Sequence, residues 1–83
     1  MPYISQQDRE EINQGREPES AGELNYKITT LIQSYLDRTC VKGVSYGKIN
    51  EVIGALECCK LELYRRLAAP YEDKKMQENG DVY

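Results

Sequence analysis

The chain has 83 residues, of which 40% are hydrophobic and 30% charged, and its formal net charge is −3. This length predicts one small domain and excludes a multidomain enzyme. A chain of this size buries roughly 60–65% of its extended surface on folding, so we expect a second copy to supplement a marginal core. The absence of His, Trp and Phe excludes histidine general-base chemistry and His-containing metal sites. We expect no cofactor and no metal.

The three cysteines predict reduced thiols in a cytoplasmic protein. Cys58 and Cys59 are adjacent, and successive residues of a helix point about 100° apart, so the two cannot easily bridge each other. Neither forms a CxxC motif with Cys40, and residues 1–3 do not start a signal peptide. No apolar run approaches the roughly 20 residues of a membrane span. The acidic balance argues against non-specific nucleic-acid binding, and we expect no sequence-specific nucleic-acid partner either.

Residues 1–22 form the first of three predicted segments, an N-terminal arm. Ser5 is placed to cap a short helical turn over about residues 6–13. Ile4 and Ile12 are available to dock that turn against a neighbour. The remainder of the arm is predicted to be a loop.

The next segment, residues 23–69, is predicted to be a helical hairpin. Ser20 caps a helix from Glu23 to about Arg38, with Glu23 at the capping-box position. A second helix runs from about Tyr46 to Leu67. Each helix has one apolar face whose residues follow one another at steps of three and four. In the first helix the face consists of Leu24, Ile28, Leu31 and Tyr35, widened by Ile32 and Leu36. In the second helix it consists of Ile49, Val52, Leu56, Cys59 and Leu63. The short connection favours an antiparallel all-α hairpin with facing stripes.

The other side of the second helix carries small residues, and its members are Gly47, Gly54, Cys58 and Leu61. A glycine inside a helix costs about 1 kcal/mol relative to alanine, so Gly54 calls for a close approach of another backbone. Either the N-terminal arm or the C-terminal tail of the same subunit covers this glycine face, or a second copy does. The second alternative predicts a homo-oligomer.

The third segment, residues 70–83, is predicted to be a short polar helix followed by a tail. Pro70 either ends the long helix or starts this one, because proline is tolerated in a first helical turn. Asn79-Gly80 is a stop signal. With few apolar side chains, the segment must dock or become ordered on binding.

Several blocks of the sequence carry a resemblance to a known family. They are Gly22–Tyr26, Ser45–Tyr46, Ile49–Glu57, Tyr64–Arg66, Pro70–Lys75 and Glu78–Tyr83. Together they resemble an uncharacterised family of short proteins from bacteria and phages, from Gly22 to the end of the chain. The resemblance implies no established activity. It does imply a phage-type or bacterial setting, and the partners we consider are a host protein and a small anionic nucleotide.

A cluster near the end of the long helix is the candidate binding site, made of Tyr64, Arg65, Arg66, Tyr71, Asp73, Lys74 and Tyr83. One arginine is expected to pair with Glu62 and the other to stay free. A free guanidinium beside tyrosine rings is suited to gripping a phosphate and stacking on a base. The alternative is a solvated helix end, in which Arg65 or Arg66 pairs with Asp73 or Asp81.

Acidic residues suggest a weaker alternative, and they are Glu51, Glu57, Glu62, Glu78 and Asp81. They faintly resemble those of the all-α nucleotide pyrophosphohydrolases, which hold Mg²⁺ with carboxylates from two helices. Gly80 interrupts the helix that would present the last two, which argues against this reading. We therefore expect no enzyme but a non-catalytic helical binding module, which acts as an interaction or inhibitor protein. The alternative is a sponge that holds a small anionic nucleotide at a subunit interface.

Overall fold

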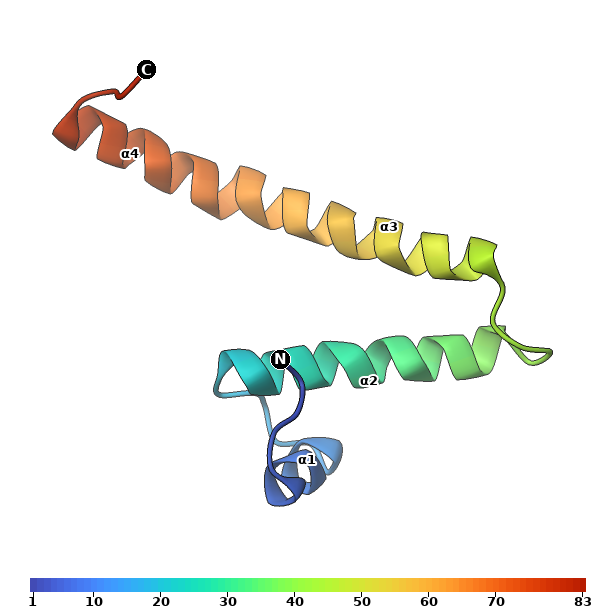
Figure 1. Cartoon of the computed structure of the whole chain (residues 1–83). Helices are drawn as coiled ribbons and strands as arrows, with labels where there is room; N and C mark the ends of the chain where they lie inside the picture. The colour runs from blue at the N-terminus through green and yellow to red at the C-terminus, as the bar shows by residue number, and fades with distance from the viewer. The chain divides into compact units, whose positions relative to one another are not determined.

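The computed structural model describes residues 1–83 and consists of helices without strands (Figure 1). The elements in chain order are α1 (Gln6–Asn13), α2 (Ala21–Thr39), α3 (Tyr46–Leu63), the π-helical turn η1 (Tyr64–Ala68) and α4 (Ala69–Asn79). The prediction of an all-α chain is confirmed. The chain divides into two compact units, Met1–Ser45 and Tyr46–Tyr83, which we describe separately. The three-segment division stays a prediction.

Two serine caps set the helix starts of the first unit. The Ser5 hydroxyl accepts a hydrogen bond from the Asp8 backbone N–H at 3.2 Å, and the Ser20 hydroxyl accepts one from the Glu23 N–H at 3.1 Å. Each cap satisfies a backbone donor that has no partner within the helix. Both predicted caps are therefore confirmed.

The helix α1 packs on α2 through Ile12. This residue is the only buried one of the chain, with 1% of its surface exposed. Nearby, the Tyr26 hydroxyl of α2 donates a hydrogen bond to Asn13 Oδ1 at 3.1 Å. The first residues also lie close to α2, because a Cβ placed on Gly22 would come within 3.2 Å of the Met1 carbonyl oxygen. The N-terminal arm is thus docked on α2 through Ile12, as predicted.

Arg16 ties the same region together through its guanidinium. Its nitrogens lie 3.3 Å from Asp8, 3.0 Å from Glu11, 3.6 Å from Glu19 and 2.7 Å from Glu23. We call these five side chains the Arg16 cluster. They come from α1, from the loop that follows it and from the first turn of α2, so the cluster crosslinks three successive elements.

The second unit is one helical run from residue 46 to residue 79, about 50 Å long at 1.5 Å per residue. The expected stop at Leu67 is wrong, because η1 and α4 continue α3 without a break (Figure 1). Pro70 lies in the first turn of α4, where its missing N–H is tolerated. The Ala69 N–H donates to the Tyr64 carbonyl, five residues back, in the wider turn that precedes the proline.

The extra residue of the π turn extends the apolar stripe of α3. In place of alternating steps of three and four, the stripe continues from Leu63 to Leu67 and Tyr71 by two steps of four. These side chains are 60%, 65% and 62% exposed. No residue of Tyr46–Tyr83 is buried, so the second unit has an apolar face and no core. None of the helices combines the length and hydropathy needed to cross a bilayer.

Candidate functional site

Arg65 and Arg66 both bind one carboxylate. Arg65 Nη2 and Arg66 Nε each donate to Glu62 Oε1 at 2.7 Å. Arg65 lies three residues after Glu62 along the helix, and Arg66 lies four residues after it. The hydrogen bonds from Arg66 and then Arg65 hold the pKa of Glu62 below its ordinary value. The expectation that one arginine stays free is therefore wrong. The pairing resembles the solvated helix end that was the alternative, with Glu62 in the place of Asp73 and Asp81.

Tyr71 has a cation above its ring. Lys75 Nζ lies 5.7 Å from the ring centroid, within the range of a cation–π contact, and also 3.4 Å from Glu78 Oε2. The neighbouring Lys74 is exposed. The lysine that contacts Tyr71 is thus Lys75, which was not among the predicted site residues.

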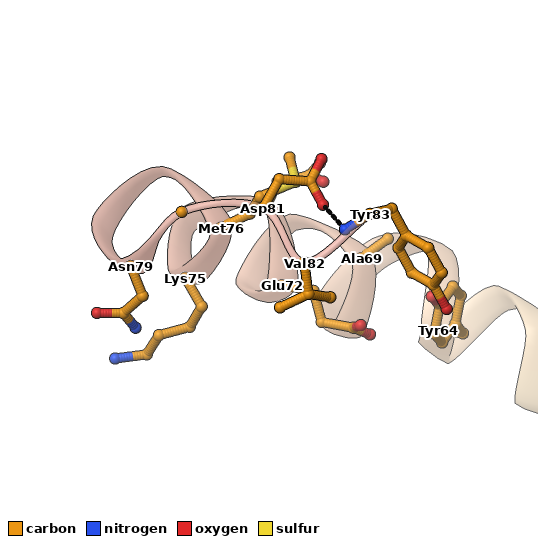
Figure 2. A pocket seen from close by; sticks show the side chains of 11 residues that line it. Tyr64, Ala69, Glu72, Lys75, Met76, Asn79, Asp81, Val82 and Tyr83 are labelled. Atoms are coloured by element: carbon orange, nitrogen blue, oxygen red, sulfur yellow. Dashed lines mark hydrogen bonds between the residues drawn. The ribbon is translucent and has the colours of Figure 1, made fainter.

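The C-terminal tail turns back along α4, and the two border an open hollow of about 460 Å³. Gly80 has φ +89° and ψ 152°, a conformation that is nearly restricted to glycine, and it ends α4. The Tyr83 N–H then donates to Asp81 Oδ1 at 2.9 Å. Figure 2 shows the tail above the helix, and the hollow is lined by Tyr64, Ala69, Glu72, Asp73, Lys75, Met76 and residues 79–83.

This hollow brings part of the predicted site together. Tyr64, Asp73 and Tyr83 line it, whereas Arg65, Arg66, Tyr71 and Lys74 do not. Its charged lining consists of three carboxylates, from Glu72, Asp73 and Asp81, and one ammonium group, from Lys75. Such a lining does not complement an anion.

The predicted glycine face is open within the second unit. No atom lies within 4 Å of a Cβ built on Gly54, so the C-terminal tail does not cover it. Gly47, Cys58 and Leu61 are exposed as well. Cys58 and Cys59 are free thiols. The structure therefore leaves the glycine face available, and the proposed contact with a second copy stays a prediction.

The acidic residues of α3 pair with cations of their own helix. Glu51 binds Lys48 at 2.8 Å and Glu57 binds Lys60 at 2.9 Å. Nowhere in the chain do three His, Cys, Asp or Glu side chains come together as metal ligands. The four glutamates weighed for Mg²⁺ thus pair with cations of the same helical run, whereas Asp81 accepts from the Tyr83 N–H.

The Arg16 cluster was missed by the sequence analysis, which assigned Arg16 to a featureless loop. Arg16 is half-buried and its guanidinium pairs with four carboxylates. The available signal was compositional, since Arg16 is a lone cation between acidic residues on both sides. Its position in a loop gave no periodicity to detect.

Comparison with known proteins places the chain in a family but gives it no characterised relative. No curated protein and no solved structure matches it. The model of one family, described as Domain of unknown function (DUF6899), matches residues 1–82. Since the match covers nearly the whole chain, the protein belongs to this family.

Proposed function

We propose that this chain is a non-catalytic helical binding module that works as a homo-oligomer. The observation that carries the proposal is the helical run 46–79, which exposes large apolar side chains along its length and buries none. A helix without tertiary contacts is only marginally stable in water. Covering the stripe with another chain supplies the hydrophobic contacts that stabilise it.

A helical hairpin is part of the same proposal. The connection between α2 and α3 is short, and both helices carry apolar side chains at steps of three and four residues. Short connections favour antiparallel neighbours in helical bundles. A hairpin of this kind is a unit from which a small bundle assembles.

The partner of the assembled module is proposed to be a protein. Tyr46, Tyr64, Tyr71 and Tyr83 are all well exposed on the second unit. Tyrosine gives a large contact area with little loss of side-chain entropy, and it is enriched at protein interfaces. The resemblance to bacterial and phage proteins supports a host protein as that partner, with the module acting as its inhibitor.

No observation favours the nucleotide sponge or the pyrophosphohydrolase. The hollow beside α4 has an acidic lining, and the arginines that would grip a phosphate share Glu62. Both alternatives remain predictions from the sequence. A nucleotide panel tests the first, because a ligand that binds the native state raises its melting temperature.

Light scattering and sedimentation of the full chain over a range of concentrations test the homo-oligomer. The expected result is a dimer or larger species at micromolar concentration. Leu56→Glu, which puts a charge in the stripe, should dissociate the assembly, whereas Asn50→Glu outside the stripe should not. A monomer that keeps its full helix content at micromolar concentration would contradict the proposal.

A further inference from the structure

We propose that the hollow between the C-terminal tail and α4 receives an arginine side chain from a basic segment of the partner protein. This inference rests on the binding module proposed above and names the chemistry of its partner. The tyrosine rings of the hollow stack on the guanidinium, and its carboxylates accept hydrogen bonds from it. No residue of the apolar stripe of α3 lines the hollow, so the site is separate from the stripe.

The hollow lies on a part of the helical run that α2 is too short to cover. α2 has 19 residues and is about 28 Å long, whereas the run from residue 46 to residue 79 is about 50 Å long. In an antiparallel hairpin that starts at the connection, the first residue of α2 lies opposite about residue 64. A hairpin therefore leaves η1 and α4 open to another protein.

The negative charge that lacks a partner in the second unit gathers in this hollow. The side-chain carboxylates of the unit that do have a partner are those of Glu51, Glu57, Glu62, Glu78 and Asp81. The remaining two are those of Glu72 and Asp73, which make no ion pair and no side-chain hydrogen bond. Both line the hollow. A cation from outside the chain is the partner that they fit.

The one cation of the hollow does not neutralise them. Lys75 Nζ lies 3.4 Å from Glu78 Oε2 and 5.7 Å from the centroid of the Tyr71 ring. Neither Glu78 nor Tyr71 lines the hollow. The ammonium charge is thus taken up outside the lining, and the hollow stays acidic.

The other walls favour arginine over lysine. Figure 2 shows Tyr64 and Tyr83 at one end of the hollow, and Met76 and Val82 add apolar surface to it. A guanidinium is planar and weakly hydrated, so it stacks on aromatic rings and binds a carboxylate through two parallel hydrogen bonds. An ammonium group is a strongly hydrated point charge that does neither as well.

The surroundings of the hollow favour a protein segment over a free small molecule. The hollow is open, so a single side chain leaves much of its own surface in water. Leu67 and Tyr71 lie on the same uncovered part of the run and are 65% and 62% exposed. The neighbours of the arginine in a protein segment can contact such apolar side chains, which a free amino acid cannot do.

Titration of the full chain with a hexa-arginine peptide, blocked at both ends, tests the inference. The peptide should bind saturably, and the NMR amide shifts should centre on residues 64–83. Glu72→Gln combined with Asp73→Asn should weaken binding about tenfold or more, because it removes two acceptors of charge-assisted hydrogen bonds. Glu17→Gln combined with Asp37→Asn is the matched control. It makes the same change of charge in the first unit, at two exposed side chains without an ion pair, and should leave binding within about twofold.

Tyr83→Ala separates stacking from charge. The wild-type chain should prefer hexa-arginine over a blocked hexalysine of the same charge by about threefold or more. The variant should lose most of this preference, because it keeps the carboxylates and removes one ring. Circular dichroism checks that each variant keeps the helix content of the wild-type chain.

Four results would overturn the hollow as the site. They are no binding, equal weakening by the two double variants, amide shifts centred on the Arg16 cluster, and a blocked single arginine that binds as tightly as the peptide. Each leaves the homo-oligomer standing, because sedimentation of the chain without peptide measures assembly separately. A monomeric chain that still binds hexa-arginine in the hollow supports this inference and overturns the homo-oligomer.

Discussion

Met1–Ser45 and Tyr46–Tyr83 use their charges in different ways. In the first unit, Arg16 joins carboxylates up to eight residues away and from three successive elements. In the second unit, the pairs of Lys48, Lys60, Arg65, Arg66 and Lys75 span three or four residues of one helix. Tertiary contacts thus support the first unit. In the second unit these ion pairs are local to one helix and no residue is buried, so we expect it to need a partner.

The largest effect should come from Ile12, the sole buried side chain. Ile12→Ala removes the apolar contact between α1 and α2 and should cost about 2–5 kcal/mol. Hydrogen exchange should show that the amides of α1 lose their protection, with little change in 46–79. Val41→Ala is the control, because Val41 is 87% exposed. Equal losses in the two variants would mean that α1 is not docked through Ile12.

Arg16→Gln should have the next largest effect. The substitution leaves the four carboxylates of the Arg16 cluster close together without their shared cation, so they repel one another. The effect should be smaller than that of Ile12→Ala, because the cluster is partly exposed to water. Arg38→Gln is the control, since Arg38 donates to the Ser34 carbonyl of its own helix. If both variants melt at the same temperature, the cluster does not stabilise the first unit.

Acid should weaken the first unit through Glu23. The hydrogen bond from Arg16, followed by that from the Glu19 N–H, holds the pKa of Glu23 below its ordinary value of 4.5. The folded state therefore binds this proton less tightly than the unfolded state. The stabilisation is complete above pH 4.5 and is lost as the pH falls through the lowered pKa of the folded state.

Thermal melting between about pH 2 and pH 7 measures this dependence. Glu23→Gln removes the titrating group and should flatten the acid limb of the curve. Glu62→Gln is the comparison in the second unit, where the pKa is also lowered but the pair is local to one helix. An unchanged acid limb in Glu23→Gln would assign the acid sensitivity to other groups.

The smallest effect, with the opposite sign, should come from Gly54→Ala. A Cβ at this position meets open space, so alanine should stabilise the helix by about 0.5–1 kcal/mol. Gly22→Ala provides the contrast in the first unit, because its Cβ would crowd the Met1 carbonyl oxygen at 3.2 Å. A lower melting temperature for Gly54→Ala would show that another chain lies against the glycine face.

Local sequence patterns predicted the helices and their caps. Ser5 and Ser20 stand where a hydroxyl can bond the N–H three residues on, and the apolar periodicity predicted α2 and α3. The continuation of the helix past Pro70 was not predictable from local rules. A π turn accommodates the proline, and such a turn gives no signal in the hydropathy pattern. The Arg16 cluster was missed for a related reason, since its members come from separate elements. The return of the tail over α4 depends on one glycine conformation.

The concentration dependence of hydrogen exchange in residues 46–63 tests the central claim most directly. If this helix depends on a second copy, its amide protection should fall as the full chain is diluted below the dissociation constant of the assembly. Protection of α1 and of the start of α2 should stay constant, because Ile12 and Arg16 act within one chain. Unchanged protection of 46–63 in a chain shown to be monomeric would contradict the account.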